Sequence, residues 1–299
     1  MKEKIIIEEQ GLRDGLQTLD IFIPTETKLR WITQLLSAGL ERIQVTSFVN
    51  PKVMPLMADA ELIFSAVSQI ELSQSQTITA LVLNEKGVDR AIAAGAKHLA
   101  ISLSASNTHS LKNTRMSIDA AKIAIKNTIQ KAKTNGIKVR SGVQCAFGCR
   151  FEGKIKETSV FDLLEFLKDC GADELALADS TGMANPIQMK NMSKIALQIA
   201  DNQLLGLHLH NTENRGYANV YAAVEAGVRQ FDTAFGGLGG CPFIKGATGN
   251  IATEDTVKML TEMGFETNID IEKVALISKE IEVILGHKLP GYLYSNVRL

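Results

Sequence analysis

The histidines His208 and His210 are the residues of this sequence best suited to chemistry, because both end one apolar run at 204–210. Residues two positions apart on a β-strand lie on the same face, so the two imidazoles would point in one direction. Two neutral imidazoles at a fixed spacing can provide half of the ligands of a divalent metal. Ordinary hydrogen-bonded histidines also form such pairs, so the prediction of a metal site depends on further ligands.

A second polar group, EQGLRDGLQ at 9–17, follows the first apolar run of the chain. Asp14 offers a hard oxygen ligand, and Arg13 beside it can bind a carboxylate or a developing oxyanion. The alternative is a surface turn with a solvated ion pair, which is what most R-D-G triplets form.

A third group is rich in glycine, with four glycines in the five positions 236–240, followed by Cys241 and Pro242. So little side-chain volume predicts a loop rather than a core segment. Beside an active site, such a loop would act as a lid that carries the Cys241 thiol over a substrate. The alternative is a tight connection with an incidental cysteine. The segment continues to Asn250.

Regular elements must position these groups, and one pattern recurs along the chain. An amphipathic helical stretch ends at a glycine and a short apolar run follows, at Gly39, Gly95, Gly136, Gly171 and Gly227. A glycine just past a helix accepts the left-handed conformation of a C-cap. Short apolar runs between polar residues are typical of buried parallel strands. The alternation predicts βαβ units and a parallel sheet.

Eight such runs occur, and we expect strands at 4–8, 42–47, 77–82, 98–104, 138–144, 174–179, 204–210 and 230–235. Eight strands, each followed by helix-compatible sequence, predict a closed (β/α)8 TIM barrel. The alternative is an open doubly wound sheet, which usually carries a glycine-rich phosphate fingerprint that is missing here. Active sites of barrels lie at the carboxyl ends of the strands, where the three polar groups occur.

One more helix is expected at 267–286, after the last strand. We therefore expect a single catalytic domain over 1–299, with a barrel core of about 4–265 and a C-terminal helical extension of about 266–299.

The composition excludes several classes of protein. A formal net charge of −1 gives no strong positive field for nucleic acid or an anionic membrane. The chain has neither the apolar run of a membrane-spanning helix nor that of a signal peptide. Four cysteines do not make a disulfide framework, and Cys145 and Cys149 lack partners for a zinc site. We expect a cytoplasmic protein with reduced thiols.

Taken together, the motifs resemble the hydroxymethylglutaryl-CoA lyase family of aldolase-like, metal-dependent barrels. The shared motifs are R-D-G-L-Q at 13–17, V-T-S-F-V at 45–49 with Pro51 and Lys52, H-x-H at 208–210, G-G-L-G-G-C-P-F at 236–243 and G-N-x-A-T-E-D at 249–255. The resemblance covers about residues 5–290, and the cysteine in the glycine-rich loop indicates the lyase branch.

The resemblance implies roles for particular residues. The implied ligands of Mg²⁺ or Mn²⁺ are Asp14, His208, His210 and Asn250. The implied catalytic residues are Arg13, Cys241, Glu9 and Asp179. Arg13 would stabilise an enolate. Asp179 is a candidate base, and its alternative role is to cap the following turn. The implied substrate contacts are Arg140, Gln17, Thr46 and Ser47.

The implied reaction cleaves 3-hydroxy-3-methylglutaryl-CoA, or a close 3-hydroxyacyl-CoA, to acetyl-CoA and acetoacetate. The expected partner is thus an acyl-CoA, with no nucleic acid and no membrane. A homodimer suits the family, although no motif specifies it. The alternatives are a condensing synthase, which usually carries added C-terminal domains, a 4-hydroxy-2-oxo acid aldolase, which needs neither CoA nor a lid cysteine, and an inactive metal-binding relative.

Three positions depart from the family pattern. Gln44 stands where the lyase has glutamate, which removes a charge beside the metal. Asp20 stands where the lyase has a lysine that could contact the acyl or CoA portion, and Asn211 replaces the aspartate that follows H-x-H. None of the three is a predicted metal ligand. They indicate a related acyl-CoA substrate or reduced activity.

Overall fold

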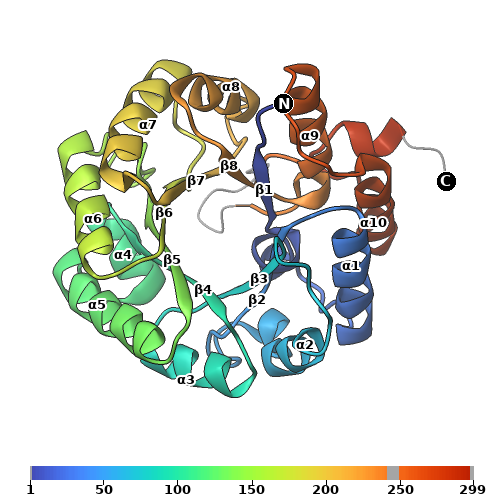
Figure 1. The fold of residues 1–299 in the computed structure, drawn as a ribbon, viewed down its shortest axis with the longest axis horizontal. Coiled ribbons are helices and arrows are strands. Elements are labelled where there is room, and N and C mark those ends of the chain that lie inside the picture. The colour runs from blue at the N-terminus through green and yellow to red at the C-terminus, as the bar shows by residue number, and fades with distance from the viewer. Residues whose placement is uncertain (1, 241–248, 297–299) are drawn as a thin grey trace.

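The computed structural model describes residues 2–240 and 249–296, which fold around a closed barrel of eight parallel strands (Figure 1). The strands follow chain order around the barrel, and β8 pairs with β1 to close it. This confirms the predicted (β/α)8 TIM barrel. The strands are β1 Ile6–Glu9, β2 Arg42–Ser47, β3 Thr77–Leu81, β4 His98–Ser104, β5 Lys138–Gln144, β6 Glu174–Asp179, β7 Leu204–Leu209 and β8 Gln230–Thr233.

Helices form a ring around the outside of the barrel (Figure 1). The last of them corresponds to the helix predicted after the barrel, and it packs against α1 and α9. The helices are α1 Thr25–Ser37, α2 Ala60–Val67, α3 Glu85–Ala93, α4 Asn107–Thr114, α5 Ile118–Thr134, α6 Glu157–Asp169, α7 Pro186–Ala200, α8 Gly216–Ala226, α9 Thr253–Glu262 and α10 Ile271–Leu285. Short helical turns also follow β1, at Gly11–Gly15 (η1), and β8, at Phe235–Gly237 (η4).

Glycines end helices as the sequence pattern predicts. Gly227 is the C-cap of α8 with a φ of 108°, in the left-handed region that disfavours a side chain. Gly39, after α1, has a φ of 92°, and a Cβ there would lie 2.2 Å from the backbone oxygen of Asn268. Both conformation and space therefore exclude a side chain at Gly39.

Side chains of the strands alternate between two buried faces. Ile43 and Val45 of β2 are fully buried on the face toward the helices, whereas Gln44 between them lines a cavity inside the barrel. On β7, Leu207 is fully buried and the adjacent His208 lines the same cavity. The apolar core thus lies between sheet and helices, and the barrel interior is left for polar groups.

Within the described ranges, none of the helices has the length and apolar character required to cross a bilayer.

Candidate metal centre and active site

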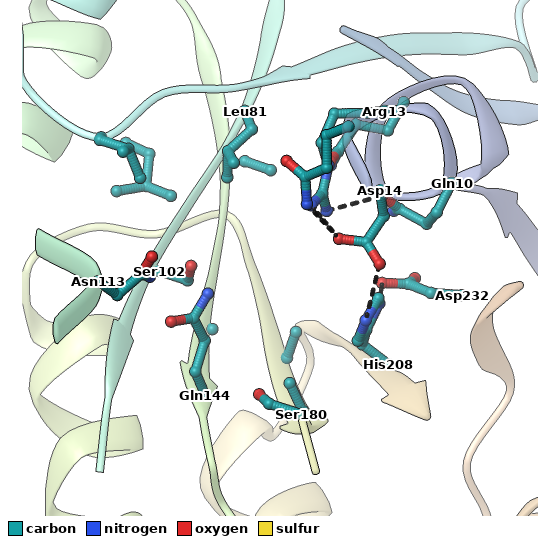
Figure 2. A pocket seen from close by; sticks show the side chains of 18 of the residues that line it. Gln10, Arg13, Asp14, Leu81, Ser102, Asn113, Gln144, Ser180, His208 and Asp232 are labelled. Atoms are coloured by element: carbon teal, nitrogen blue, oxygen red, sulfur yellow. Dashed lines mark hydrogen bonds and ion pairs between the residues drawn. The ribbon is translucent and has the colours of Figure 1, made fainter. Parts of the chain in front are cut away.

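A cavity of about 270 Å³ lies at the carboxyl ends of the strands (Figure 2). One half of its wall is polar and includes Arg13 and Asp14 of η1 with His208 of β7. Facing it, the ends of β4, β5 and β6 contribute small or uncharged residues to the lining, namely Ala100, Ser102, Gly142, Gln144, Ala176, Ala178 and Ser180. The small side chains leave room for a ligand that faces the polar half.

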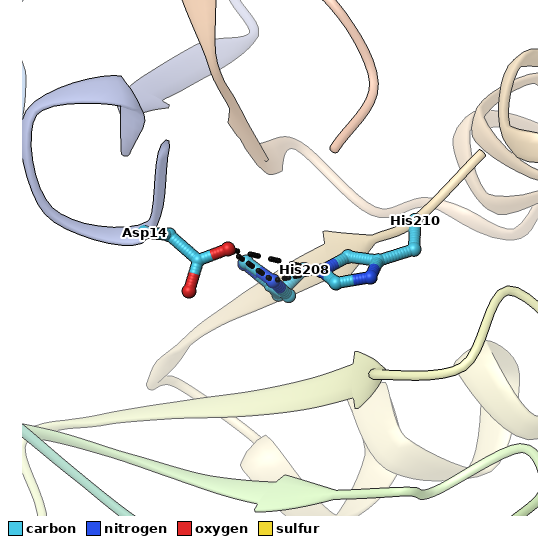
Figure 3. A group of neighbouring side chains, drawn as sticks. All are labelled: Asp14, His208 and His210. Atoms are coloured by element: carbon cyan, nitrogen blue, oxygen red, sulfur yellow. Dashed lines mark hydrogen bonds and ion pairs between the residues drawn. The ribbon is translucent and has the colours of Figure 1, made fainter. Parts of the chain in front are cut away.

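Asp14, His208 and His210 bring three metal-ligating atoms together in this cavity (Figure 3). The Nε2 atoms of the two histidines are 3.1 Å apart, and Asp14 Oδ2 lies 3.9 Å from the first and 3.8 Å from the second. In the part of the chain that the structure describes, no other set of three His, Cys, Asp or Glu side chains brings its ligand atoms this close.

The spacing of these atoms matches a single divalent cation. A triangle with sides of 3.1, 3.8 and 3.9 Å has a circumradius of about 2.1 Å, so one point lies about 2.1 Å from all three atoms. Proteins hold Mg²⁺ through oxygen, and Zn²⁺ through imidazole, at roughly 2.0–2.1 Å. One carboxylate with two imidazoles also leaves coordination positions open for a substrate. The residues present therefore fit a divalent metal.

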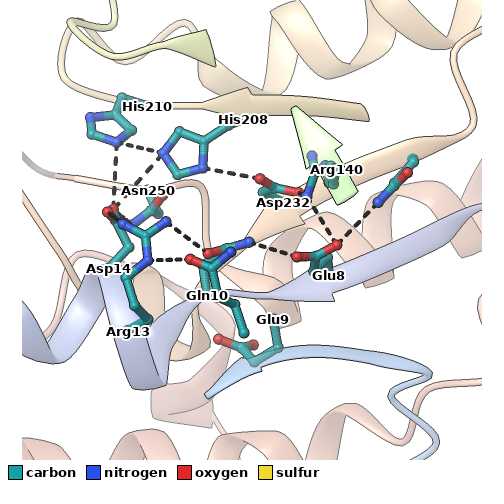
Figure 4. Close-up of polar contacts among 12 residues, drawn as sticks. Glu8, Glu9, Gln10, Arg13, Asp14, Arg140, His208, His210, Asp232 and Asn250 are labelled. Carbon is teal, nitrogen blue, oxygen red and sulfur yellow. Dashed lines mark hydrogen bonds and ion pairs between the residues drawn. The ribbon is translucent and has the colours of Figure 1, made fainter. Parts of the chain in front are cut away.

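Asp232 of β8 orients the first of these histidines (Figure 4). The two residues are paired by the strand register, and Asp232 Oδ2 lies 3.2 Å from His208 Nδ1. Arg140 Nη1 holds Asp232 in turn, at 2.8 Å from its Oδ1, and lies 2.9 Å from Glu8 Oε2. A proton on Nδ1, shared with Asp232, leaves Nε2 with the lone pair that a metal requires.

The surroundings keep the ligands in their metal-binding forms. Burial lowers the pKa of His210 to about 4, and the neighbouring His208 further opposes protonation, so this imidazole is neutral at physiological pH. Burial alone would raise the pKa of Asp14, but the Arg13 guanidinium and the two imidazoles outweigh it and hold that pKa well below its usual range. A neutral imidazole and an ionised carboxylate are the forms that bind metals.

Arg13 lies against Asp14 and lines the cavity. The backbone N–H groups of Arg13 and Asp14 both donate to the Gln10 carbonyl, at 3.0 and 2.7 Å, which coils η1 tightly after β1. The Arg13 guanidinium donates to Asp14 Oδ1, Gln44 Oε1 and Gln10 Oε1. Gln17 also donates to Asp14 Oδ1, at 3.0 Å. A guanidinium has five N–H groups, so two remain for a ligand in the cavity.

Asn250, the fourth predicted ligand, adjoins the three-residue group. It forms an isolated bridge with His210, and its Nδ2 donates to Asp14 Oδ2 at 2.9 Å and to the Leu238 carbonyl at 3.1 Å. Its Oδ1 is buried without a hydrogen-bond partner among the described residues. The amide therefore holds the Asp14 carboxylate and keeps one oxygen for a ligand.

Comparison with known proteins identifies the family of the chain that forms this site. The chain matches the HMGL-like family over residues 4–281. The hydroxymethylglutaryl-CoA lyase of Bacillus subtilis is 37% identical over 97% of this chain and 96% of its own length. The (R)-citramalyl-CoA lyase of Chloroflexus aurantiacus is 36% identical over 97% of this chain and 93% of its own length. The chain belongs to the HMGL-like family.

Solved structures agree with this HMGL-like assignment. An HMG-CoA lyase from Acinetobacter baumannii in complex with coenzyme A and 3-methylmalate has a TM-score of 0.92 and 40% identity, covering 99% of this chain and 95% of that one. The B. subtilis HMG-CoA lyase has a TM-score of 0.93 and 37% identity, covering 98% of each chain. These relatives are carbon–carbon lyases, which confirms the predicted class of enzyme.

The remaining predicted site residues of this HMGL-like chain occupy different places. Arg140 and Gln17 line the cavity. Glu9, Thr46 and Ser47 are fully buried and lie outside the cavity lining. Their catalytic or substrate-binding roles stay predictions.

Asp179, which ends β6, stabilises the turn that follows. Its Oδ1 accepts from the backbone N–H of Met183 at 3.0 Å and its Oδ2 from that of Ala184 at 3.1 Å. Burial raises the pKa of Asp179 to about 6. These contacts match the capping alternative, and a role as base stays a prediction.

Of the three residues that depart from the family pattern, one lines the cavity and two do not. Gln44 lines it beside Arg13, whereas Asp20 is exposed. Asn211 accepts from the backbone N–H of Gly216 at 2.9 Å and so holds the start of α8. The predicted lid residue Cys241 lies outside the described residues.

Sequence reasoning missed Asp232 and a charged network inside the barrel. Arg42 Nε donates to Glu8 Oε2 at 2.9 Å, and Arg42 Nη2 donates to Glu174 Oε2 at 2.7 Å. Glu8 also forms an ion pair with Arg140. Because Arg140 pairs with Asp232 as well, it joins this network to Asp232. Polar residues two positions apart were the available signal, as at 230 and 232 inside a predicted strand, or at 8 and 10 at the end of another.

Proposed function

We propose that this chain is a divalent-metal-dependent lyase that cleaves 3-hydroxy-3-methylglutaryl-CoA to acetyl-CoA and acetoacetate. The observation that carries the proposal is the point about 2.1 Å from Asp14 Oδ2 and from the Nε2 atoms of His208 and His210, at the cavity wall beside Arg13. The hydroxymethylglutaryl-CoA lyase of B. subtilis, related over nearly the whole chain, supports this substrate. The solved neighbour with coenzyme A supports an acyl-CoA.

The reaction breaks the bond between carbons 2 and 3 of the acyl group. A divalent cation at this centre supplies Lewis acidity that makes the 3-hydroxyl more acidic. When the hydroxyl loses its proton to a base, its oxygen becomes the ketone of acetoacetate, and the electrons of the broken bond pass to the thioester as an enolate. Protonation at carbon 2 then gives acetyl-CoA.

Arg13 is the residue that we assign to enolate stabilisation. Arg13 lines the cavity with two N–H groups that make none of the bonds above, and Gln10 and Gln44 already hold the guanidinium in place. Donors that are fixed before the reaction stabilise a developing oxyanion without the cost of reorganisation. We assign Cys241 to proton transfer or substrate positioning, as the family resemblance implies.

We propose Mg²⁺ or Mn²⁺ as the metal. The ligand set of Asp14, His208 and His210, with Asn250 adjoining, combines oxygen and imidazole donors. Open positions that substrate oxygens complete suit these cations better than a closed structural zinc site. We also propose that the enzyme acts in the cytoplasm, because Cys145, Cys149 and Cys170 are free thiols.

Citramalyl-CoA is a second candidate substrate, favoured by the C. aurantiacus relative at nearly equal identity. Its carboxylate is attached directly to the hydroxyl-bearing carbon, whereas one methylene separates the two in 3-hydroxy-3-methylglutaryl-CoA. Cleavage of citramalyl-CoA would release pyruvate in place of acetoacetate. The neutral Gln44 next to Arg13 is compatible with a carboxylate close to the metal.

The test uses protein freed of metal with a chelator and then supplied with Mg²⁺ or Mn²⁺. We expect acetyl-CoA and acetoacetate from 3-hydroxy-3-methylglutaryl-CoA, identified by mass, only when metal is present. Pyruvate from citramalyl-CoA without acetoacetate from the first substrate would favour the second candidate. Stoichiometric metal binding without turnover of either thioester would indicate an inactive relative. His210→Ala, the control, should lose metal binding and turnover together.

A further inference from the structure

The residues Thr253, Glu254 and Asp255, from the G-N-x-A-T-E-D motif, have no part in the chemistry above. They open α9, and each binds a different segment near the site. Thr253 Oγ1 donates to Glu9 Oε2 at 2.5 Å, and Glu254 Oε2 accepts from the Gly236 N–H at 2.9 Å. Asp255 accepts from backbone N–H groups of the C-terminal segment. The start of α9 therefore joins β1, the turn after β8 and the C-terminal segment.

Two of these contacts fix consecutive backbone amides. The N–H of Phe235 donates to Glu9 Oε1 at 3.0 Å, and the N–H of Gly236 donates to Glu254. Both carboxyl groups are buried, at 0% and 1% exposure. Gly236 has a φ of 61°, a conformation that the two bonds hold at the first turn after β8. We call Glu9 and Glu254 the carboxyl clamp.

The clamp also reaches the turn that carries Asp14. Glu9 Oε1 accepts a second bond, from the Gly11 N–H at 2.6 Å, at the start of η1. A Cβ at Gly11 would lie 2.4 Å from a ring carbon of Phe235, so η1 and η4 pack without spare room. One carboxyl group therefore sets the distance between the turn with Asp14 and the turn after β8.

A second path leads from the clamp to Asp14 through Asn250. The segment that begins at Gly236 continues to Leu238, whose carbonyl accepts from Asn250 Nδ2 at 3.1 Å. The same Nδ2 donates to Asp14 Oδ2 at 2.9 Å. The Asp14 carboxylate is thus supported from two sides, and each side depends on one member of the clamp.

We propose that Glu9 and Glu254 are positioning residues, which place Asp14 for metal binding as hydrogen-bond acceptors and do not transfer protons in catalysis. The proposal rests on the metal-dependent function above. Burial supports it by raising the pKa of Glu9 to about 8 and that of Glu254 to about 7, so neutral carboxyl groups are populated near neutral pH. A neutral carboxyl group has the shape and acceptor oxygen of an amide, so glutamine should replace each residue.

The test compares Glu9→Gln and Glu254→Gln with Glu9→Leu and Glu254→Leu. Mn²⁺ affinity is measured by calorimetry, kcat and KM are measured at saturating metal, and hydrogen exchange is followed at the Phe235 and Gly236 amides. The glutamine variants should keep wild-type metal affinity, kcat and protection. The leucine variants should bind Mn²⁺ roughly 10- to 100-fold more weakly, as when groups that support metal ligands are removed, and should lose protection at both amides. Glu262→Leu, at the exposed end of α9, is the matched control and should change none of these.

Two results would overturn the proposal. A glutamine variant that binds Mn²⁺ normally but loses kcat would make that residue an acid or base. Leucine variants that melt at lower temperature but bind Mn²⁺ normally when folded would limit the clamp to general stability. If the leucine variants do not fold, Thr253→Val removes the hydroxyl that donates to Glu9 and that also contacts Thr233 Oγ1, and leaves both carboxyl groups in place. That variant must weaken Mn²⁺ binding and expose the Phe235 amide, and normal values for both would reject the proposal.

The proposed function can fail separately. A wild-type protein that binds Mn²⁺ but cleaves neither thioester contradicts the substrate assignment and leaves the comparison of Mn²⁺ affinities intact. A wild-type protein that binds no divalent cation contradicts the metal-dependent function itself and, with it, the positioning of Asp14 for metal.

Discussion

His208 and Asp232 face each other across β7 and β8, with the imidazole Nδ1 3.2 Å from a carboxylate oxygen. This contact decides which ring nitrogen is free, because the nitrogen that shares its proton with the carboxylate cannot bind a metal. Arg140 holds the carboxylate from its other side. The orientation of one proposed ligand thus depends on two residues that do not touch the metal point.

Asp232→Asn should weaken metal binding roughly 10- to 100-fold, because the loss of the charge behind an imidazole lowers its basicity and loosens its orientation. Turnover should recover in part at high metal concentration, since the ligands themselves remain. Titration calorimetry with Mn²⁺ measures the affinity. Asp89→Asn, at an exposed ion pair with Lys131, is the control. Equal affinities in the wild type and Asp232→Asn would show that the contact does not support the centre.

Gln44→Glu should change the choice between substrates. The new carboxylate would pair with Arg13, whose guanidinium already donates to this side chain. A negative charge there repels most strongly the substrate whose carboxylate lies nearest the metal. We expect the ratio of kcat/KM for 3-hydroxy-3-methylglutaryl-CoA to that for citramalyl-CoA to rise. An unchanged ratio, measured with both thioesters under the same metal concentration, would remove Gln44 from substrate selection.

Stability should depend on pH through the carboxyl clamp. Burial raises the pKa of Glu9 to about 8 and of Glu254 to about 7, from 4.5 for a free group. The folded protein therefore holds more protons between pH 4.5 and these values. The stability that these two protonated groups contribute is complete below about pH 4.5 and is lost as pH rises through their pKa values in the folded protein.

The expected slope is at most about 1.4 kcal/mol per pH unit for each group. The free energy of unfolding is measured in urea from pH 5 to 8 for the wild type and for the double variant Glu9→Gln, Glu254→Gln. Because glutamine does not titrate, the difference between the two pH profiles is the contribution of the two glutamates. Parallel pH profiles for the two proteins would contradict the raised pKa values.

Cys241→Ser should leave metal affinity unchanged and reduce turnover, because a thiol in the glycine-rich loop is not among the proposed ligands. A serine hydroxyl is a far weaker acid than a thiol, so the loss should appear in kcat if Cys241 transfers a proton. Steady-state kinetics at saturating Mg²⁺ measure it. Wild-type turnover in this variant would remove the lid thiol from the mechanism.

The sequence predicted the architecture closely, because helix-ending glycines and short apolar runs are local signals. The predicted strands at 42–47, 98–104, 138–144 and 174–179 coincide with β2, β4, β5 and β6. The strand predicted at 230–235 ends at Thr233 in the structure. Two residues later, Phe235 begins the turn that the carboxyl clamp holds. The helix predicted at 267–286 spans Ile271–Leu285, with Asp270 as its N-cap.

The site was harder to predict, because both faces of a strand in a parallel barrel are buried. Glu8 and Gln10 face the interior, so Glu9 between them points the other way, toward Phe235 and Thr253. Polar residues two positions apart, as at 230 and 232, indicate which side chains share a face, but they do not show which partners those side chains meet inside the barrel. The contact of His208 with Asp232 likewise depends on the register between two strands that are separated along the chain by α8.

The unequal halves of the cavity have an evolutionary consequence. The groups that would hold the cation come from one side, whereas Ala100, Ala176 and Ala178 shape the facing wall. A point mutation in that wall can therefore alter which acyl chain is accepted while the reaction centre survives. The B. subtilis and C. aurantiacus relatives, which are about equally similar to this chain, are named for different acyl-CoA substrates, and a change confined to this wall is one route to such a difference.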